Sequence, residues 1–216
     1  MVKVSPSAAL VIIDVQKGFD EPFWGKRNNP DAEKVMEEVL RRFRSNGRKI
    51  IHVRHDSLNP SSILKAGKPG FEFKNEVRPL EHETIITKHV NSAFIGTKLE
   101  SILREMGEPE VYVMGLTTDH CVSVTARMSG NLGFRTFVIR DACAAHTRFL
   151  DGKKIDADTV HKVNLASIEG DFAQVRGEIT EEEMSAALSE MNNVNRDLIL
   201  SFTRETESRL RKKYRW

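Results

Sequence analysis

Three reactive side chains each follow an apolar run of the sequence. Asp14 comes directly after Ala9–Ile13, Lys88 comes directly after residues 84–87, and Cys121 lies in the loop that follows residues 110–114. In open parallel sheets, ligands bind outside the carboxyl ends of the strands. If these runs are parallel strands of one sheet, an acid, a cation and a thiol meet at one edge of it.

These three groups suit nucleophilic catalysis. A thiol, with a pKa of about 8.5, is mostly protonated at neutral pH and needs a base or positive surroundings to become a nucleophile. We expect Asp14 to accept the thiol proton and later deliver it to a leaving amine. We expect Lys88 to hold Asp14 ionised and to place a cation beside the sulfur. Taken singly, each residue also has an ordinary alternative role, as a helix cap, a solvated lysine or a buried core cysteine.

The backbone around Cys121 supports the same chemistry. Residues 115–121 read as a strand-to-helix turn, and Cys121 lies at the expected start of the next helix. Unpaired N–H groups and the helix dipole favour an anion at such a place. The same N–H groups are suited to bind the oxyanion of a tetrahedral intermediate, which completes an acyl-transfer site.

The elements that must position these residues alternate along the chain. Short apolar runs predict six strands, the last of them marginal, at residues 9–13, 49–53, 84–87, 110–114, 136–139 and 172–175. Helical periodicity is found between them at residues 31–47, where Asp31 is the expected N-cap, and at 97–106, 122–132 and 157–167. This alternation predicts an α/β fold: a single doubly wound domain with a mostly parallel six-stranded sheet and helices on both faces.

Three further segments lie outside this pattern. Residues 56–78 are rich in Pro, Gly, Ser and Lys and are too long for an ordinary connection, so we interpret them as a substrate-site loop or lid. Thr180 and Glu183 have capping-box spacing ahead of another helix. We expect one domain over residues 1–192 and an amphipathic extension over 193–216, which is a solvated terminal helix, a subunit contact or a site for an anionic partner.

Composition excludes several classes of protein. Of the 216 residues, 33 are Lys or Arg and 31 are Asp or Glu, and 33 − 31 = +2 leaves no excess charge for binding nucleic acid or an anionic membrane. The longest early apolar run, residues 8–13, is too short to span a bilayer, and no basic leader precedes it, so we expect a cytoplasmic protein. Two cysteines, Cys121 and Cys143, provide no disulfide framework, and we expect Cys143 to be buried structure. The chain has no glycine-rich phosphate loop and no His-Glu-x-x-His zinc motif.

The same residues carry a resemblance to a known family. The chain reads ALVIIDVQKGF at 9–19, ITKHVNSAF at 86–94 followed by GTKL, GLTTDHCVSVTA at 115–126 and DACAA at 141–145. In order and spacing these segments resemble the isochorismatase-like cysteine hydrolases, which include nicotinamidases, N-carbamoylsarcosine amidohydrolases and ureidoacrylate and biuret hydrolases. The resemblance covers about residues 8–190 and implies that Asp14, Lys88 and Cys121 are the catalytic residues.

Further site residues follow from the resemblance. It implies a non-proline cis peptide between Leu116 and Thr117, with the oxyanion held by the backbone N–H groups of Thr117 and Cys121. The residues that we expect to contact substrate, with packing as the alternative for several of them, are Gln16, Phe19, Trp24, His55, Phe94 and Leu116. Trp24 has the further alternative of packing against a partner chain. The resemblance also implies a homo-oligomer, a dimer or a tetramer.

Departures from the family pattern narrow the expected function. Nicotinamidases carry an Asp-x-His metal site after the second strand, whereas this chain has Arg54-His55-Asp56, so we expect no metal and no other cofactor. Isochorismatases typically lack the cysteine and often continue into a carrier domain. We therefore expect a metal-independent hydrolase that cleaves a C–N bond of a small amide, ureido or carbamoyl compound through a Cys121 thioester. The alternatives are a metal-assisted nicotinamidase, an isochorismatase-type activity and a catalytically silent binding protein.

Overall fold

A computed structural model describes residues 4–184 of the chain. Residues Ser7–Ile179 form one compact unit, which contains all the elements discussed below unless stated otherwise. No helix in the described range is both long and apolar enough to cross a membrane. The expected boundary at residue 192 and the expected extension 193–216 lie outside the described residues.

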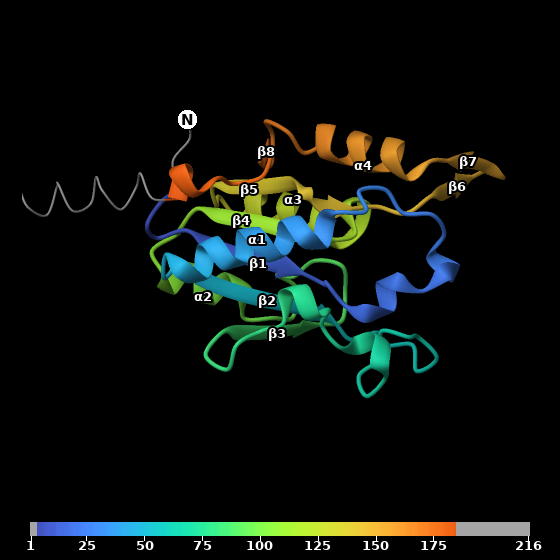
Figure 1. Ribbon diagram of the computed structural model, residues 1–216, viewed down its shortest axis with the longest axis horizontal. Coiled ribbons are helices and arrows are strands. Elements are labelled where there is room, and N and C mark those ends of the chain that lie inside the picture. The colour runs from blue at the N-terminus through green and yellow to red at the C-terminus, as the bar shows by residue number, and fades with distance from the viewer. Residues whose placement is uncertain (1–3, 185–216) are drawn as a thin grey trace, which may run out of the picture. The chain divides into compact units, whose positions relative to one another are not determined.

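A six-stranded sheet forms the centre of this unit (Figure 1). Its strands lie in the order β3-β2-β1-β4-β5-β8, and all five pairings are parallel. Their bounds are β1 Ala9–Ile13, β2 Lys49–His55, β3 Thr84–Lys88, β4 Val111–Leu116, β5 Thr136–Ala144 and β8 Gln174–Arg176. The six predicted strands are therefore confirmed, and their ends differ from the predicted ends by up to five residues. Apolar and β-branched runs indicate where a buried strand lies, but they do not define the residues at which it begins and ends.

Helices cover both faces of the sheet, as predicted. Helix α1 (Ala32–Ser45) lies on one face, where Phe43 contacts Tyr112 edge-on at 5.7 Å between ring centroids. Figure 1 shows α2 (Leu99–Glu105) and α3 (Ser123–Asn131) behind the sheet from this viewpoint, and α4 (Ala157–Ala166) beside β5 and β8. Buried residues of α2, α3 and α4 share one apolar cluster with alternate residues of β1 and β4.

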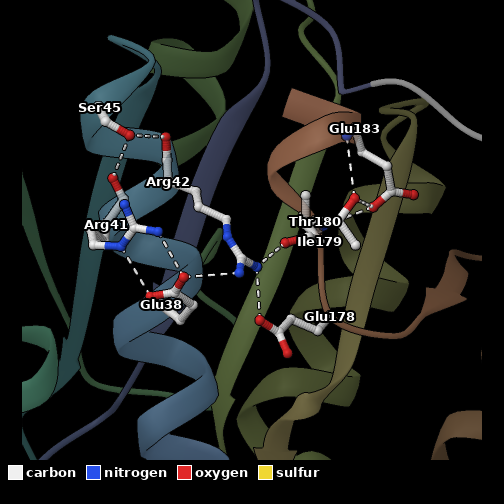
Figure 2. Close-up of polar contacts among 8 residues, drawn as sticks. All are labelled: Glu38, Arg41, Arg42, Ser45, Glu178, Ile179, Thr180 and Glu183. Atoms are coloured by element: carbon white, nitrogen blue, oxygen red, sulfur yellow. Dashed lines mark hydrogen bonds and ion pairs between the residues drawn. The ribbon is translucent and has the colours of Figure 1, made fainter. Parts of the chain in front are cut away.

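The start of α1 differs from expectation. Asp31 occupies the N-cap position, but its side chain accepts no capping hydrogen bond. The helix is instead held by its apolar face and by charged contacts at its other end. Arg42 bridges Glu38 on its own helix and Glu178 after β8, at 2.9 and 2.7 Å, and also donates to the Ile179 carbonyl (Figure 2).

The capping box at residue 180 is confirmed. The Thr180 backbone N–H donates to the Glu183 carboxylate at 2.9 Å, and the Glu183 backbone N–H donates to the Thr180 hydroxyl at 3.3 Å (Figure 2). These are the two reciprocal bonds that define the motif. The described part of the helix that follows ends at Met184.

A small hairpin was not predicted from the sequence. Strands β6 (Arg148–Leu150) and β7 (Lys153–Ile155) pair antiparallel, joined by Asp151 and Gly152. Both turn residues have positive φ, 50° and 73°, which is the conformation that an Asp-Gly hairpin turn requires. The hairpin brings Arg148 to the site described next.

Candidate active site

The three predicted catalytic residues lie together. Asp14 directly follows β1 and Lys88 is the last residue of β3, and both are fully buried. The Lys88 Nζ lies 2.5 Å from the Asp14 Oδ2 and 3.3 Å from the Cys121 Sγ. The carboxyl ends of parallel strands therefore bring together acid, cation and thiol, as the positions after each apolar run predict.

Lys88 has two further neighbours. Its ammonium lies 3.2 Å from the Val90 carbonyl and 3.4 Å from the His55 Nδ1, and it faces both as a donor. Burial and the positive charge of Lys88 lower the pKa of His55, so this imidazole is neutral at pH 7 and Nδ1 is its acceptor nitrogen. Asp14 is therefore the negative charge that balances the ammonium.

Burial and the neighbouring charges together set the proton affinities of the site. It raises the pKa of Asp14, although the ion pair with Lys88 opposes this. Burial alone would lower the pKa of Lys88, but the negative charges of Asp14 and of a Cys121 thiolate outweigh it, so the pKa of Lys88 is raised and the ammonium stays charged. Burial and the Asp14 charge also raise the pKa of Cys121. Desolvation of the thiolate therefore outweighs the nearby cation and the favourable backbone at the turn, and the resting group is a thiol that needs Asp14 as its base.

Cys121 lies in the short connection between β4 and α3. The peptide bond between Leu116 and Thr117 is cis, as the resemblance implies, and residues Thr118–Val122 form a π-helical turn. The N–H groups of His120 and Val122 both donate to the Thr117 carbonyl, at 3.1 and 3.2 Å. Helix α3 begins at Ser123, so Cys121 is placed before the helix rather than in its first turn.

A cavity of about 300 Å³ opens beside the sulfur. Its walls come from the segment after β1, the end of β2, the 56–78 loop, the loop after β3, the Cys121 turn and the β6–β7 hairpin. The lining residues are Phe19, Trp24, His55, Leu64, Asn91, Thr117, His120, Cys121 and Arg148. Of the residues that we expected to contact substrate, the structure places Phe19, Trp24 and His55 on this cavity.

The other three expected contacts do not line the cavity. Gln16 is fully buried, and its side-chain amide is hydrogen-bonded to the backbone. It donates to the carbonyls of His55 and Phe71 and accepts from the His55 N–H. Phe94 is core, stacked on Phe134 at 6.1 Å between ring centroids. Leu116 is fully buried at the end of β4. All three side chains are buried and point to other parts of the protein. Their positions in the sequence close to a reactive residue therefore did not indicate a contact with the cavity.

The sequence did not indicate four residues of the cavity wall, which are Leu64, Asn91, His120 and Arg148. Leu64 belongs to the long 56–78 loop, which was expected near the site without a named residue. Asn91 lies with its Oδ1 3.9 Å from the Cys121 Sγ. Arg148 donates to Asp119 at 2.7 Å and to the His120 Nδ1 at 3.0 Å, so the hairpin is bonded to the Cys121 turn. An Asp-Gly pair between two short β-rich runs was the signal for this hairpin.

The side chains of His52 and His55 in β2 and of Asp56 directly after it do not fit a metal ion. The His52 Nε2 is paired with Glu83 at 2.8 Å, and the His55 Nδ1 faces the Lys88 ammonium. The carboxylate of Asp56 accepts the Ala66 N–H at 2.8 Å and pairs with Lys65 at 3.1 Å. Over residues 4–184, no three His, Cys, Asp or Glu side chains lie close enough together to hold a metal.

Comparisons of the sequence and the fold with those of known proteins identify the family of the chain. Residues 8–176 match the model of the isochorismatase domain. The chain is 46% identical over 168 residues to YrdC, an uncharacterized isochorismatase family protein of Bacillus subtilis, which covers 77% of this chain and 90% of the relative.

Solved structures of similar fold include an isochorismatase-family protein of Chromobacterium violaceum and N-carbamoylsarcosine amidase of Thermoplasma acidophilum. The first is 40% identical with a TM-score of 0.81, over 88% of this chain and 97% of that one. The second is 25% identical with a TM-score of 0.64, over 81% and 98%. Because the family model matches most of this chain and a relative is nearly half identical to it, this chain belongs to the isochorismatase family of hydrolases.

Proposed function

We propose that the protein is a cysteine hydrolase that cleaves a C–N bond of a small amide, ureido or carbamoyl compound without a metal. Cys121 is the nucleophile, Asp14 the proton carrier and Lys88 the fixed cation. The observation that carries the proposal is the contact of one buried ammonium with both the Asp14 carboxylate, at 2.5 Å, and the Cys121 sulfur, at 3.3 Å, beside a cavity.

In the first half-reaction, the Cys121 Sγ attacks the substrate carbonyl carbon while its proton passes to Asp14. Burial raises the pKa of Asp14, which makes it a stronger base than an exposed carboxylate. The oxyanion of the tetrahedral intermediate is bound by the backbone N–H groups of Thr117 and Cys121. The C–N bond then breaks, Asp14 returns its proton to the leaving nitrogen, and ammonia or an amine departs from a thioester.

In the second half-reaction, Asp14 takes a proton from a water molecule, whose oxygen attacks the thioester carbonyl. The C–S bond breaks, the acid is released and the proton on Asp14 returns to the sulfur. The sum is one amide and one water converted to one acid and one amine. Lys88 keeps its proton throughout, because its pKa is raised by the acids beside it.

The cavity supports a small substrate. Its volume of about 300 Å³ is at the lower end of the range for ligand pockets, and its lining combines the aromatic residues Phe19 and Trp24 with polar side chains. An amidase is among the relatives of the same fold. A metal-assisted route is less well supported, since His52, His55 and Asp56 already have cation or hydrogen-bond partners.

The experiment is a comparison of two cysteine variants on a panel of amides, ureas and carbamoyl compounds. Cys121→Ala and Cys143→Ala each remove one thiol, the first from the turn between β4 and α3 and the second, which is fully buried, from β5. We expect Cys121→Ala to release no ammonia or amine and Cys143→Ala to keep at least half of the wild-type kcat. Acid-quenched wild-type enzyme should carry the acyl group on Cys121 by mass spectrometry, and added hydroxylamine should convert it to a hydroxamate.

Three results would contradict the proposal. Turnover by Cys121→Ala would mean that water attacks directly, as in an isochorismatase-type reaction. Ligand binding without turnover or an acyl-enzyme across the whole panel would indicate a binding protein that no longer performs the reaction. Loss of wild-type activity on chelation, restored by a divalent metal, would favour a metal-assisted nicotinamidase.

A further inference from the structure

The turn that carries Cys121 is held by side chains from two later elements of the fold. Thr118, the first residue of the turn, lies with its hydroxyl 2.8 Å from the Nδ1 of His161 on α4. Asp119, the next residue, accepts from Arg148 of β6 at 2.7 Å. The element that carries the nucleophile is therefore bonded through consecutive side chains to the segment that follows β5.

The Thr118–His161 contact is buried on both sides. Thr118 is 1% exposed and His161 is 8% exposed. Neither hydroxyl nor ring lies against bulk water, so loss of one partner leaves the other with an unpaired polar group. Burial lowers the pKa of His161, and the nearby charges are Asp158, Asp141, Lys162 and Arg140. The ring is therefore neutral at pH 7, and the contact is an ordinary hydrogen bond whichever nitrogen carries the proton.

His161 does not line the cavity, unlike Arg148. A change at His161 can therefore reach the chemistry only through the turn. The backbone bonds of the turn run from residues 120 and 122 to the Thr117 carbonyl, so they close the turn on itself without attaching it to α4. The side chain of Thr118 provides that attachment, three residues before the sulfur.

We propose that His161 is a positioning residue, which holds Thr118 and thereby sets where the Cys121 Sγ lies relative to Lys88 and the cavity. The proposal rests on Cys121 being the nucleophile of the proposed function. The sulfur lies 3.3 Å from the Lys88 Nζ, so a displacement of about 1 Å would break that contact. A shift of this size at a reacting group costs up to about 100-fold in rate, and we expect about 10-fold for loss of one holding bond.

The test is the rate of Cys121 alkylation by iodoacetamide at pH 8, in a Cys143→Ala background so that one thiol reports. His161→Phe keeps a ring without the nitrogen, and Thr118→Val keeps the side-chain shape without the hydroxyl. We expect each to slow alkylation about 10-fold, because a sulfur displaced from Lys88 loses the cation that stabilises its thiolate. His161→Asn, which places an amide near the position of Nδ1, and Thr118→Ser should stay within about 2-fold of the parent.

A double-mutant cycle separates this hydrogen bond from other effects. If the two residues act through one bond, His161→Phe with Thr118→Val slows alkylation no more than either change alone. Val160→Ala, at a buried neighbour on α4, is the control for helix packing: it should lower the melting temperature and leave the rate unchanged. On any amide that the panel turns over, kcat should fall with KM unchanged, since neither residue contacts the ligand.

Unchanged or faster alkylation in both Phe and Val variants would overturn the proposal, as would slowing of the same size in Val160→Ala. Should His161→Phe not fold, the Thr118→Val and Thr118→Ser pair decides alone, because equal rates for these two would also overturn it. Failure of the proposed function is distinguishable: it would appear as turnover by Cys121→Ala, while alkylation of Cys121 would still report on the turn.

Discussion

Lys88→Met tests the electrostatic logic of the site without any knowledge of the substrate. The substitution keeps a long side chain and removes the ammonium, which leaves the fully buried Asp14 carboxylate without its counter-charge. A lone charge in such a place is strongly destabilising, whereas a neutral carboxylic acid is not. We therefore expect Asp14 in this variant to bind a proton when the chain folds.

The cost of that proton sets the size of the effect. At 2.5 Å the Coulomb attraction between the two charges is on the order of 7 kcal/mol for an effective dielectric constant of about 20, before the opposing cost of burying both groups. Protonation limits the loss, because an unfolded Asp with a pKa of about 3.9 takes up a proton at a cost of about 1.4 kcal/mol per pH unit above it. The penalty in Lys88→Met is then about 2 kcal/mol at pH 5.5 and about 4 kcal/mol at pH 7.

The sign follows from linkage. In Lys88→Met the folded pKa of Asp14 lies above the unfolded one, so the folded state binds more protons and stability is lost as pH rises from about 4 towards the folded pKa. Asp14→Asn with Lys88→Met removes the titrating group. Its free energy of unfolding should therefore exceed that of Lys88→Met by about 4 kcal/mol at pH 7 and by about half of that at pH 5.5.

The assay is urea unfolding of both variants between pH 5 and 8, followed by circular dichroism. A stability difference between the two that stays constant with pH would refute the reasoning, because it would mean that Asp14 stays charged in the folded state without Lys88. Activity provides a second readout. Lys88→Met should lower kcat at least about 1000-fold at pH 7, since a protonated Asp14 cannot accept the thiol proton.

Three further predictions concern the cavity wall, a buried ion cluster and a glycine. Trp24→Ala removes the indole that donates to the Gly18 carbonyl and packs on Phe19, so KM should rise about 10-fold with kcat changed less than about 3-fold in steady-state kinetics. Burial opposes the ionisation of Glu33, but the hydrogen bonds from Arg27 and Lys74 and the charges of these two residues outweigh burial and lower the pKa of Glu33 from 4.5 to about 2. This contribution to stability is present above the unfolded pKa and is lost as pH falls from about 4.5 through about 2, so acid titration of Glu33→Gln should show a smaller stability loss over that window than wild type. Gly115→Ala should yield no folded protein by thermal melting, because φ at this residue is +134° and a Cβ would collide with the Ile13 carbonyl.

The sequence predicted those parts of the molecule that depend on local pattern. Buried parallel strands need continuous apolar runs, and β1, which is buried along its whole length, shows such a run without interruption. The topology then fixes which ends of the strands meet, so Asp14 and Lys88 could be placed at one edge although 74 positions separate them in the sequence. The capping box at Thr180 has the same local character.

The parts that depend on side-chain direction were not predictable in this way. Gln16 is two residues beyond Asp14, yet its amide turns to the backbone of the neighbouring segments and binds three groups there. Phe94 turns into the core, where it belongs to the apolar cluster that includes residues of α2 and α3, so its burial is favoured by the hydrophobic effect. Arg148 reaches the cavity only because the unpredicted hairpin carries it there.

The raised thiol pKa is consistent with nucleophilic chemistry once the charges are considered together. With Asp14 ionised, Lys88 charged and Cys121 protonated, the buried group of three is neutral overall. Transfer of the proton from sulfur to carboxylate gives a neutral carboxylic acid, the same ammonium and a thiolate, which is neutral overall as well. The cost of burying net charge is therefore nearly unchanged by the transfer, and the ammonium, 2.5 Å from one acceptor and 3.3 Å from the other, stabilises the anion in either place. A site of this kind does not need a resting thiolate. It needs a cation that stays charged whether the negative charge is on Asp14 or on Cys121. Removal of Lys88 should therefore disturb both stability and turnover.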